Sequence, residues 1–150
     1  MEAALGPVFG VDRQLIGDGT YFVVEDAGQI VGCGGWSKRR SLYGSDDGRL
    51  GPDPELNPAH DAARVRAFFV HPLWARRGIG SSIMRCCERA IIEAGYARVD
   101  IVATLVGEPL YAAFGYQIIE RYNIELRDGL TLPVVRMTKS IVYDRGHAKQ

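Results

Sequence analysis

The chain has 150 residues, 47% of them hydrophobic and 24% charged, and its 18 basic residues balance its 18 acidic residues. This composition is typical of a globular protein, and we expect a single domain over residues 1–150. The zero net charge argues against a general nucleic-acid binder. No apolar run approaches the roughly 18 residues of a membrane span, and the N-terminus lacks the pattern of a signal peptide.

The cysteines indicate a reducing environment. They are three, an odd number, and two of them, Cys86 and Cys87, are adjacent within a helical pattern. This arrangement fits neither a disulfide framework nor a zinc site, so we interpret them as small apolar residues of a cytoplasmic protein.

The first half of the chain predicts a hairpin followed by a long loop. Residues 1–19 leave room for one helical stretch with a rough apolar face. The segments 20–26 and 29–37 are expected to be strands, because a tight Ala-Gly turn separates two stretches rich in β-branched, aromatic and apolar residues. Residues 38–62 are rich in Gly, Pro, Asp and Asn, and loops of this length are often functional or mobile.

The centre of the chain predicts a strand, a helix and a second strand. We expect a strand over 63–70, with Arg64, Arg66, Phe68 and Val70 on one face. His71-Pro72 ends it. An apolar residue at every fourth position predicts a helix over about 78–94. The strand predicted over 97–105 then lies parallel to 63–70, as in a right-handed βαβ unit.

The last third predicts a short helix and a closing hairpin. The helix covers 107–116, with Pro109 in its first turn and Gly115 at its end. Strands over 117–126 and 132–141 are joined by a turn at 127–129, and we expect 142–150 to be a mobile tail. The fold class predicted is α/β, a mixed and mostly antiparallel sheet flanked by helices.

The segment "HPLWARRGIGSSIM", 71–84, predicts an anion site, because it leads from a strand into a helix. The first N–H groups of a helix lack partners within it, and the helix dipole makes that end positive. Gly78 and Gly80 let a ligand approach the backbone. Arg76 and Arg77 add charge, and Ser81 and Ser82 add hydroxyl donors. Phosphate groups bind at such places.

Three phosphate-binding patterns compete for this loop. A P-loop needs a lysine that the loop lacks. A dinucleotide fingerprint needs a third glycine where Ile83 stands, although Asp100 lies about twenty residues on, where that fingerprint has an acid. The third pattern is the pyrophosphate loop of acyl-CoA N-acyltransferases, and "VHPLWARRGIGSSIM" resembles that of the GNAT superfamily. Ala75 departs from this pattern, since the family has Gln or Arg there.

A second motif supports the same resemblance. "LYAAFGY", 110–116, is similar to the family's L-Y-x-x-x-G-F/Y element and follows the loop by about thirty residues. The resemblance covers about residues 20–141. Two motifs at this spacing, with strand and helix in the right order, are more specific than either motif alone.

The resemblance implies how acetyl-CoA is bound and used. Strands 63–70 and 97–105 splay apart around pantetheine, and the N–H of Val70 or a neighbour polarises the thioester carbonyl. Tyr111 matches the family tyrosine that protonates the CoA thiolate. Thr104 stands where many relatives carry an Asn that contacts the cofactor. The cofactor-binding residues implied are Phe68, Phe69, Val70, Arg76, Arg77, Gly78, Ile79, Gly80, Ser81, Ser82 and Thr104, with no metal.

The function implied is acetyl transfer to the primary amine of a small-molecule acceptor. Many relatives place a Glu base on the strand that matches 63–70, but here the polar residues are Arg64 and Arg66, and arginine stays protonated. The base is left open between a water chain, a loop residue and an amine that arrives neutral. The loop candidates are Asp53, Glu55, His60 and Asp61.

Three side chains are candidates for contact with the acceptor. Arg64 and Arg66 either bind a carboxylate or phosphate on the substrate or pair with acids within the fold. Trp36 either lines the acceptor pocket or packs in the core.

Two alternatives to this function stay open at this point: a non-catalytic acyl-CoA-binding module, and a protein N-terminal or lysine acetyltransferase. A dinucleotide-dependent oxidoreductase is a more distant rival. Relatives normally carry a strand and one or two helices before the first hairpin, and only residues 1–19 precede it here. We therefore expect the first strand and helix to be missing, strand 20–26 to be an exposed edge, and a homodimer to cover it. The alternative is a monomer whose N-terminal stretch folds back over the sheet.

Overall fold

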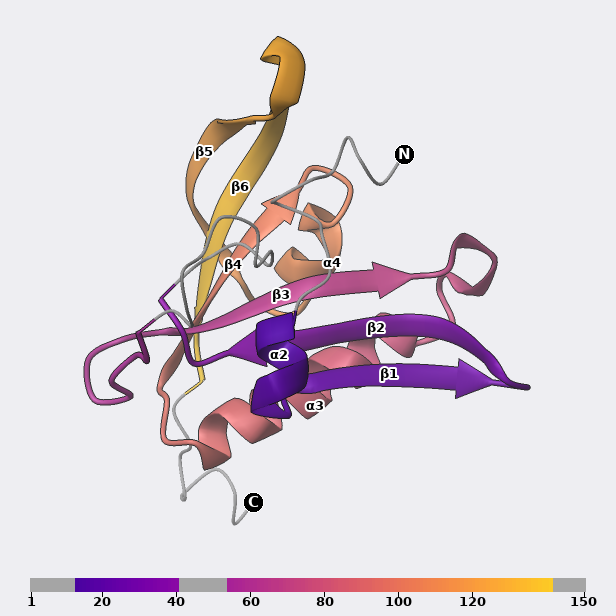
Figure 1. Ribbon diagram of the computed structural model, residues 1–150, viewed down its shortest axis with the longest axis horizontal. Helices are drawn as coiled ribbons and strands as arrows, with labels where there is room; N and C mark the ends of the chain where they lie inside the picture. The colour runs from indigo at the N-terminus through magenta and orange to yellow at the C-terminus, as the bar shows by residue number, and fades with distance from the viewer. Residues whose placement is uncertain (1–12, 41–53, 142–150) are drawn as a thin grey trace.

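A computed structural model describes residues 13–40 and 54–141. One sheet runs through the molecule, and helices lie against both of its faces (Figure 1). The elements in chain order are α2 (Arg13–Asp18), β1 (Tyr21–Asp26), β2 (Gln29–Ser37), β3 (Ala63–Val70), η1 (Pro72–Trp74), α3 (Ile79–Glu93), β4 (Arg98–Thr104), α4 (Glu108–Ala113), β5 (Gln117–Glu125), η2 (Arg127–Gly129) and β6 (Thr131–Ser140).

The six strands lie in the order β1-β2-β3-β4-β6-β5. Neighbouring strands are antiparallel except β3 and β4, which α3 connects as a parallel pair. The hairpin, the βαβ unit and the closing hairpin predicted from the sequence are therefore confirmed, with element ends that differ by at most one residue. The short helix α4 ends at Ala113, three residues before its predicted end. The fold is α/β, with a mixed and mostly antiparallel sheet.

The core lies between the sheet and α3. The helix turns Ile83, Met84, Cys87 and Ile91 inward, because their spacing of one, three or four residues places them on one side. They pack with buried residues of the central strands, among them Val65, Val99, Ile101, Val135 and Met137. Alternate residues of each strand face opposite sides of a sheet, so the neighbours of these core residues lie on the face away from α3.

Glycines on β2 let both layers approach the strand closely. A Cβ at Gly32 would lie 2.6 Å from Ile79 Cγ2, and one at Gly34 would lie 2.7 Å from the Phe68 ring and 2.9 Å from Ile83 Cγ2. On the other face, a Cβ at Gly35 would lie 2.5 Å from the Thr20 carbonyl oxygen and 2.9 Å from Leu15 of α2. The start of α3 thus sits directly on the backbone of β2.

A β-bulge interrupts β3 and corrects one expectation. The register with β2 passes from Gly35↔Arg66 to Cys33↔Phe69, so two residues of β3 face one of β2. Ala67 takes a positive φ of 64°, and its carbonyl oxygen accepts from the Cys33 thiol at 3.6 Å. The prediction that Arg64, Arg66, Phe68 and Val70 share a face is wrong, because the extra residue changes the alternation.

After the bulge the side chains of β3 change sides. Phe68 packs against the core on the α3 side, as Val65 does before it, and Val70 approaches the position of Gly80 in α3. Arg64 and Arg66 flank Val65 and therefore lie on the opposite face. The bulge moves Phe68 away from the face of the two arginines.

The parallel pair β3–β4 stays together for only part of its length. The paired residues are Ala63↔Val99, Arg64↔Asp100 and Val65↔Ile101. Beyond them, Arg66–Val70 and Val102–Thr104 have no partners on each other, although β4 continues to pair with β6 as far as Thr104. We call these two unpaired segments the splay. The splay expected around the cofactor is present.

Strand β1 forms an edge of the described sheet, because it pairs with β2 alone. Val23, in the middle of β1, is 51% exposed. The edge expected at strand 20–26 is present within the described residues, and the predicted N-terminal stretch 1–19 is described only from residue 13. The mobile tail predicted at 142–150 lies outside the described residues.

Replacing Gly34 with alanine should destabilise the fold, because the new methyl group meets the Phe68 ring and Ile83 at sub-contact distances. Overpacking of this kind costs about 1–3 kcal/mol. Urea unfolding measures the loss. The matched control is Gly17→Ala in α2, where a Cβ meets nothing within 4 Å. Equal stability of Gly34→Ala and wild type would contradict the close packing of Phe68 on β2.

Candidate active site

The loop after β3 leaves the start of α3 without a cap. His71 Nδ1 accepts from the Leu73 N–H at 3.1 Å and shapes the short turn η1. Gly78 then takes the N-cap position with φ 81°, and no side chain bonds to the helix end. The first bond of the helix runs from the Ser82 N–H to the Gly78 carbonyl oxygen at 3.0 Å.

The first amides of α3 are without acceptors in the described part of the chain. No described residue accepts a hydrogen bond from the N–H groups of Ile79, Gly80 or Ser81. These N–H groups point away from the first turn of the helix, which is the positive end of the helix dipole. Because Gly78 needs a positive φ, a side chain at that position would strain the turn that presents them.

The side chains around this helix start are cationic and mostly exposed. The Arg77 guanidinium lies 4.7 Å from the centre of the Trp74 ring, a cation–π contact that holds it beside the helix end. Arg76 is exposed and has a φ of 64°. Ser82 accepts from Arg85 at 3.4 Å. The glycines, arginines and serines of the predicted loop therefore lie together at this helix start, and Trp74, which the sequence motif did not indicate, lies with them.

Gly80, in the first turn of α3, lies close to α4 and to the end of β3. A Cβ there would lie 3.3 Å from Leu110 of α4 and 3.8 Å from Val70 of β3. The first turn of α3 therefore stands beside both α4 and the end of β3. Larger side chains at position 80 would enter the space between these elements.

Tyr111 lies on the α3 side of the splay. Its ring makes edge-on contacts with Phe68, at 5.9 Å between centroids, and with Tyr116, at 6.3 Å. The residue is buried, and burial is the main cause that raises the pKa of its phenol above the usual value. Within the described part of the chain, the Tyr111 hydroxyl has no hydrogen-bond partner. It is thus protonated at neutral pH and can donate to a ligand.

Tyr116 provides a contrast within the same aromatic cluster. Its hydroxyl donates to Glu88 at 2.8 Å, and Glu88 also accepts from Lys139 at 3.0 Å. Burial and the neighbouring Glu88 raise the pKa of Tyr116. The Tyr116 hydroxyl thus bonds to the ion pair of Glu88 and Lys139, whereas the Tyr111 hydroxyl has no such partner among the described residues.

Thr104 ends β4 and connects it to α4. Its hydroxyl oxygen accepts from the Gly107 N–H at 3.3 Å, and its carbonyl oxygen accepts from the same group at 3.1 Å. A Cβ at Gly107 would approach the Tyr111 ring at 3.1 Å. Thr104 therefore shapes the turn that brings Tyr111 to the splay.

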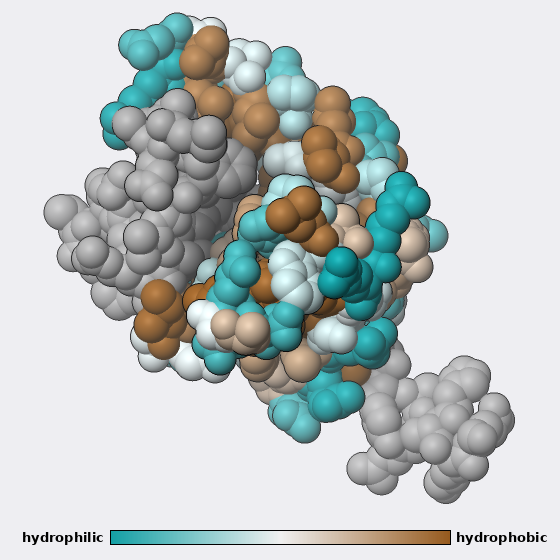
Figure 2. Space-filling model, turned by 90° about the vertical axis from the view of Figure 1, so that its right-hand side faces the viewer, coloured by the Kyte–Doolittle hydropathy of each residue, from teal (hydrophilic) through white to brown (hydrophobic). Residues whose placement is uncertain are grey.

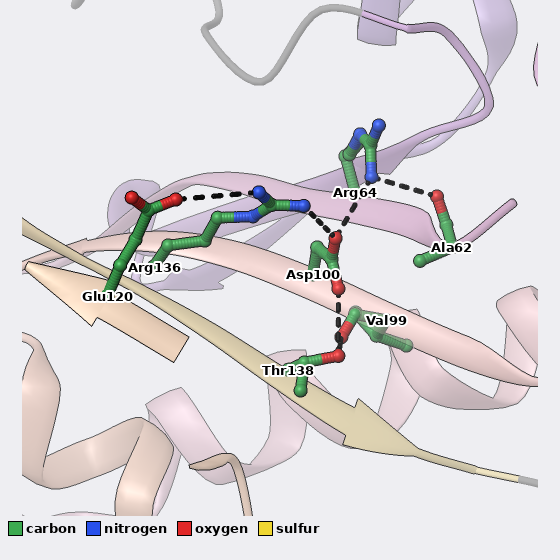
Figure 3. A network of polar contacts seen from close by, with 7 residues as sticks. All are labelled: Ala62, Arg64, Val99, Asp100, Glu120, Arg136 and Thr138. Carbon is green, nitrogen blue, oxygen red and sulfur yellow. Dashed lines mark hydrogen bonds and ion pairs between the residues drawn. The ribbon is translucent and has the colours of Figure 1, made fainter. Parts of the chain in front are cut away.

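The opposite face of the central strands carries a network of charges (Figure 3). Asp100 is 2% exposed and accepts from Arg64 at 3.2 Å, from Arg136 at 3.1 Å and from Thr138 at 2.8 Å. Arg136 also lies 3.6 Å from Glu120. Arg64 is thus paired with an acid inside the fold. Asp100, which stands where the dinucleotide fingerprint has an acid, is the hydrogen-bond acceptor at the centre of this network.

The other two residues considered for contact with the acceptor substrate, Arg66 and Trp36, are buried. Arg66 lies on the same face as Arg64 and is 7% exposed. Trp36 is 6% exposed and packs edge-on against Tyr96 at 6.1 Å within the core, which favours its packing role over a pocket wall.

The loop residues considered as bases lie away from the splay. His60 and Asp61 precede β3 at the end where it pairs with β4, and Asp61 accepts from the Asn57 N–H at 2.7 Å. Glu55 is exposed and lies 3.7 Å from Arg39. Asp53 lies outside the described residues. The structure brings none of the described candidates to the unpaired part of β3.

Arg136 is a residue of this charged network that the sequence did not indicate. It lies on β6 between the buried residues Val135 and Met137, so strand alternation alone places it on the polar face. Its partnership with Asp100 needed the register of β4 with β6, which pairs Val102 with Arg136. A single sequence does not contain that register.

The end of the molecule toward which β3 points is mixed in polarity. Figure 2 looks onto this end and shows brown apolar side chains among teal hydrophilic ones. The loops that follow β3 and β4 carry exposed apolar residues, namely Leu73, Leu105 and Val106. Among the described residues, no group of His, Cys, Asp and Glu could hold a metal ion, and no helix is long and apolar enough to cross a membrane.

Solved structures share this fold at low sequence identity. Ard1 from Thermoplasma volcanium is similar with a TM-score of 0.61 and 18% identity, over 83% of this chain and 72% of that one. A ribosomal-protein-alanine N-acetyltransferase from Brucella melitensis gives 0.61 and 16%, over 85% and 73%. The acetyltransferase yncA from Salmonella typhimurium, solved with its cofactor acetyl-CoA, gives 0.60 and 15%, over 83% and 65%.

Comparison of the sequence with models of protein families identifies the family of this chain. No curated protein matches the chain. The family model described as "Acetyltransferase (GNAT) domain" matches residues 17–118, a span that contains the uncapped helix start, the splay and Tyr111. This chain belongs to the GNAT acetyltransferase family.

Proposed function

We propose that this protein transfers an acetyl group from acetyl-CoA to the primary amine of a small-molecule acceptor. The observation that carries the proposal is the position of the uncapped α3 start, which follows the open end of the splay and stands beside α4. A ligand with phosphates at one end and an extended chain at the other suits this arrangement. Acetyl-CoA has both parts.

The phosphates would bind at the start of α3. The N–H groups of Ile79, Gly80 and Ser81 are the donors, with charge from Arg76 and Arg77 and a hydroxyl from Ser82. A pyrophosphate there lies at the open end of the splay. Pantetheine then extends between β3 and β4 toward the point where the strands meet at Val65 and Ile101.

Backbone groups of the splay would bind pantetheine. The segment that contains Phe68, Phe69 and Val70 has no partner on β4, and its free groups can pair with the amides of pantetheine. An N–H of this segment polarises the thioester carbonyl and stabilises the oxyanion formed on attack. Thr104 bounds the other side of the splay.

The reaction would proceed by direct attack. The amine nitrogen forms a bond to the thioester carbon, the resulting oxyanion collapses, and the bond from carbon to sulfur breaks. Tyr111 then donates its proton to the CoA thiolate, while the proton of the amine passes to water. The buried phenol, whose pKa is raised, is present as the acid at neutral pH.

A homodimer in the cytoplasm completes the proposal. The three cysteines are free thiols, which fits a reducing compartment. The edge strand β1 offers backbone groups for a second copy. Light scattering measures the mass of the purified chain at micromolar concentration. We expect the mass of two chains, and a stable mass of one chain would contradict the dimer.

Replacing Tyr111 with phenylalanine should lower kcat by roughly 10²–10⁴, because the thiolate loses its proton donor. Acetyl-CoA binding should stay close to wild type, since the ring remains. Thiol release with a panel of amines measures turnover, and calorimetry measures binding.

The matched control is Tyr116→Phe. This hydroxyl lies in the same aromatic cluster but donates to Glu88, so its removal should leave kcat nearly unchanged. Full activity of Tyr111→Phe would show that another group is the acid. Tight acetyl-CoA binding with no thiol release for any amine would favour a non-catalytic binding module.

A further inference from the structure

The charged network on the face away from α3 has more donors than acceptors among the described residues. Nη2 of Arg136 and Nη1 of Arg64 donate to the same oxygen of Asp100, and Nη1 of Arg64 also reaches the Ala62 carbonyl oxygen. The Nε atoms of both arginines are buried and have no hydrogen-bond partner in the described part of the protein. Each guanidinium carries five N–H groups, so most of these donors remain unused.

Unused buried donors are costly and call for a partner. A buried donor without an acceptor destabilises the fold, and native proteins rarely leave one unpaired without water or a ligand. Solvent reaches both side chains, which are 16% exposed in Arg64 and 33% in Arg136. A ligand with several acceptor oxygens could therefore use them.

The balance of charge favours a negative ligand. Two guanidiniums share one carboxylate oxygen. The other acids that act on them are Glu120, which is 52% exposed and screened by water, and Asp61, whose charge also attracts Arg64. Burial lowers the pKa of Arg64, and Arg136 lowers it further against the opposing attraction of Asp100 and Asp61. An additional anion would relieve the repulsion between the two cations.

The register of the strands places this network where the splay begins. Arg64 and Asp100 face each other in the row before the last β3–β4 pair, and Arg136 pairs with Val102, the first residue of β4 beyond it. All three side chains lie on the face away from α3. Since the core, α3 and Tyr111 occupy the other face, an acceptor that approaches from the face away from α3 meets the arginines.

We infer that the acceptor is an amine that also carries a carboxylate or phosphate, and that Arg64 and Arg136 bind this anionic group. The inference rests on the proposed function and specifies its substrate class. The planar guanidinium matches two oxygens of a carboxylate or phosphate, and two such groups from different strands fix its orientation. Asp100 acts as a positioning residue, because it holds both arginines rather than touching the ligand.

The experiment compares amines in matched pairs. Each free amino acid is assayed beside its carboxamide, and O-phosphoethanolamine beside ethanolamine, with putrescine as a dication. We expect kcat/KM at least tenfold higher for an anionic member than for its neutral partner. The pair that shows the preference separates a carboxylate acceptor from a phosphate one. Calorimetric titration of the CoA-saturated protein with the same pairs measures binding without turnover.

Two variants separate anion binding from structural support. Arg136→Met should raise KM for the anionic amine at least tenfold, change kcat less, and bring the ratio within the pair close to one. Thr138→Val removes another donor to Asp100 but leaves both guanidiniums, and it should keep the preference. Circular dichroism and acetyl-CoA binding establish that each variant is folded.

Three results would overturn the inference. The first is a higher kcat/KM of the wild type for the neutral member of a pair or for putrescine. The second is that no anionic amine binds to the CoA-saturated protein. The third is that Arg136→Met and Thr138→Val lose the preference for the anionic amine equally. Acetylation of neutral amines alone would overturn the anionic acceptor but leave acetyl transfer intact. Failure to bind acetyl-CoA would instead refute the proposed function. If Arg136→Met does not fold, the wild-type titrations decide the matter.

Discussion

The parting of β3 from β4 is the constraint on which the rest of the site depends. The strands pair over only three rows, and the bulge at Ala67 follows the last of them by two residues. Bulges bend a strand and increase its twist. Phe68 is then turned toward α3, where Gly34 leaves room for its ring. Without this bend, β3 could continue to pair with β4 and close the space that the cofactor is proposed to occupy.

The same bend separates two environments on the faces of the sheet. On one side Phe68 contacts Tyr111 in an aromatic cluster that keeps the phenol buried and protonated. On the other side Arg64 and Arg136 converge on Asp100. Proton donation to the leaving thiolate and recognition of the acceptor are thus assigned to opposite faces. The thioester would lie between them, in the plane of the sheet.

Much of the fold could be predicted because its signals are local. Apolar spacing and turn residues identified the strands and helices, and glycines with arginines at 76–80 identified the helix start that lacks a cap. The motif around Tyr111 is also contiguous in the chain. These features depend on residues within a few positions of one another, which a single sequence contains.

The rest depended on contacts between distant segments. Alanine gives no signal for a positive φ, so the bulge at Ala67, and with it the side on which Phe68 lies, was not visible. Trp36 is apolar in a strand, and only the packing against Tyr96 shows its buried role. The position of Arg136 beside Asp100 depends on the pairing of β6 with β4. Register between strands is fixed by tertiary packing and is absent from local patterns.

In the proposed complex, acetyl-CoA lies in the splay with its phosphates at the start of α3. Hydrogen exchange of backbone amides, measured with and without saturating acetyl-CoA, tests this position. We expect slower exchange in two segments, Ala67–Val70 and Ile79–Ser82, while the β5 segment Gln117–Glu125 is unchanged. Unchanged exchange in both segments at saturation, or protection confined to other parts of the chain, would contradict it.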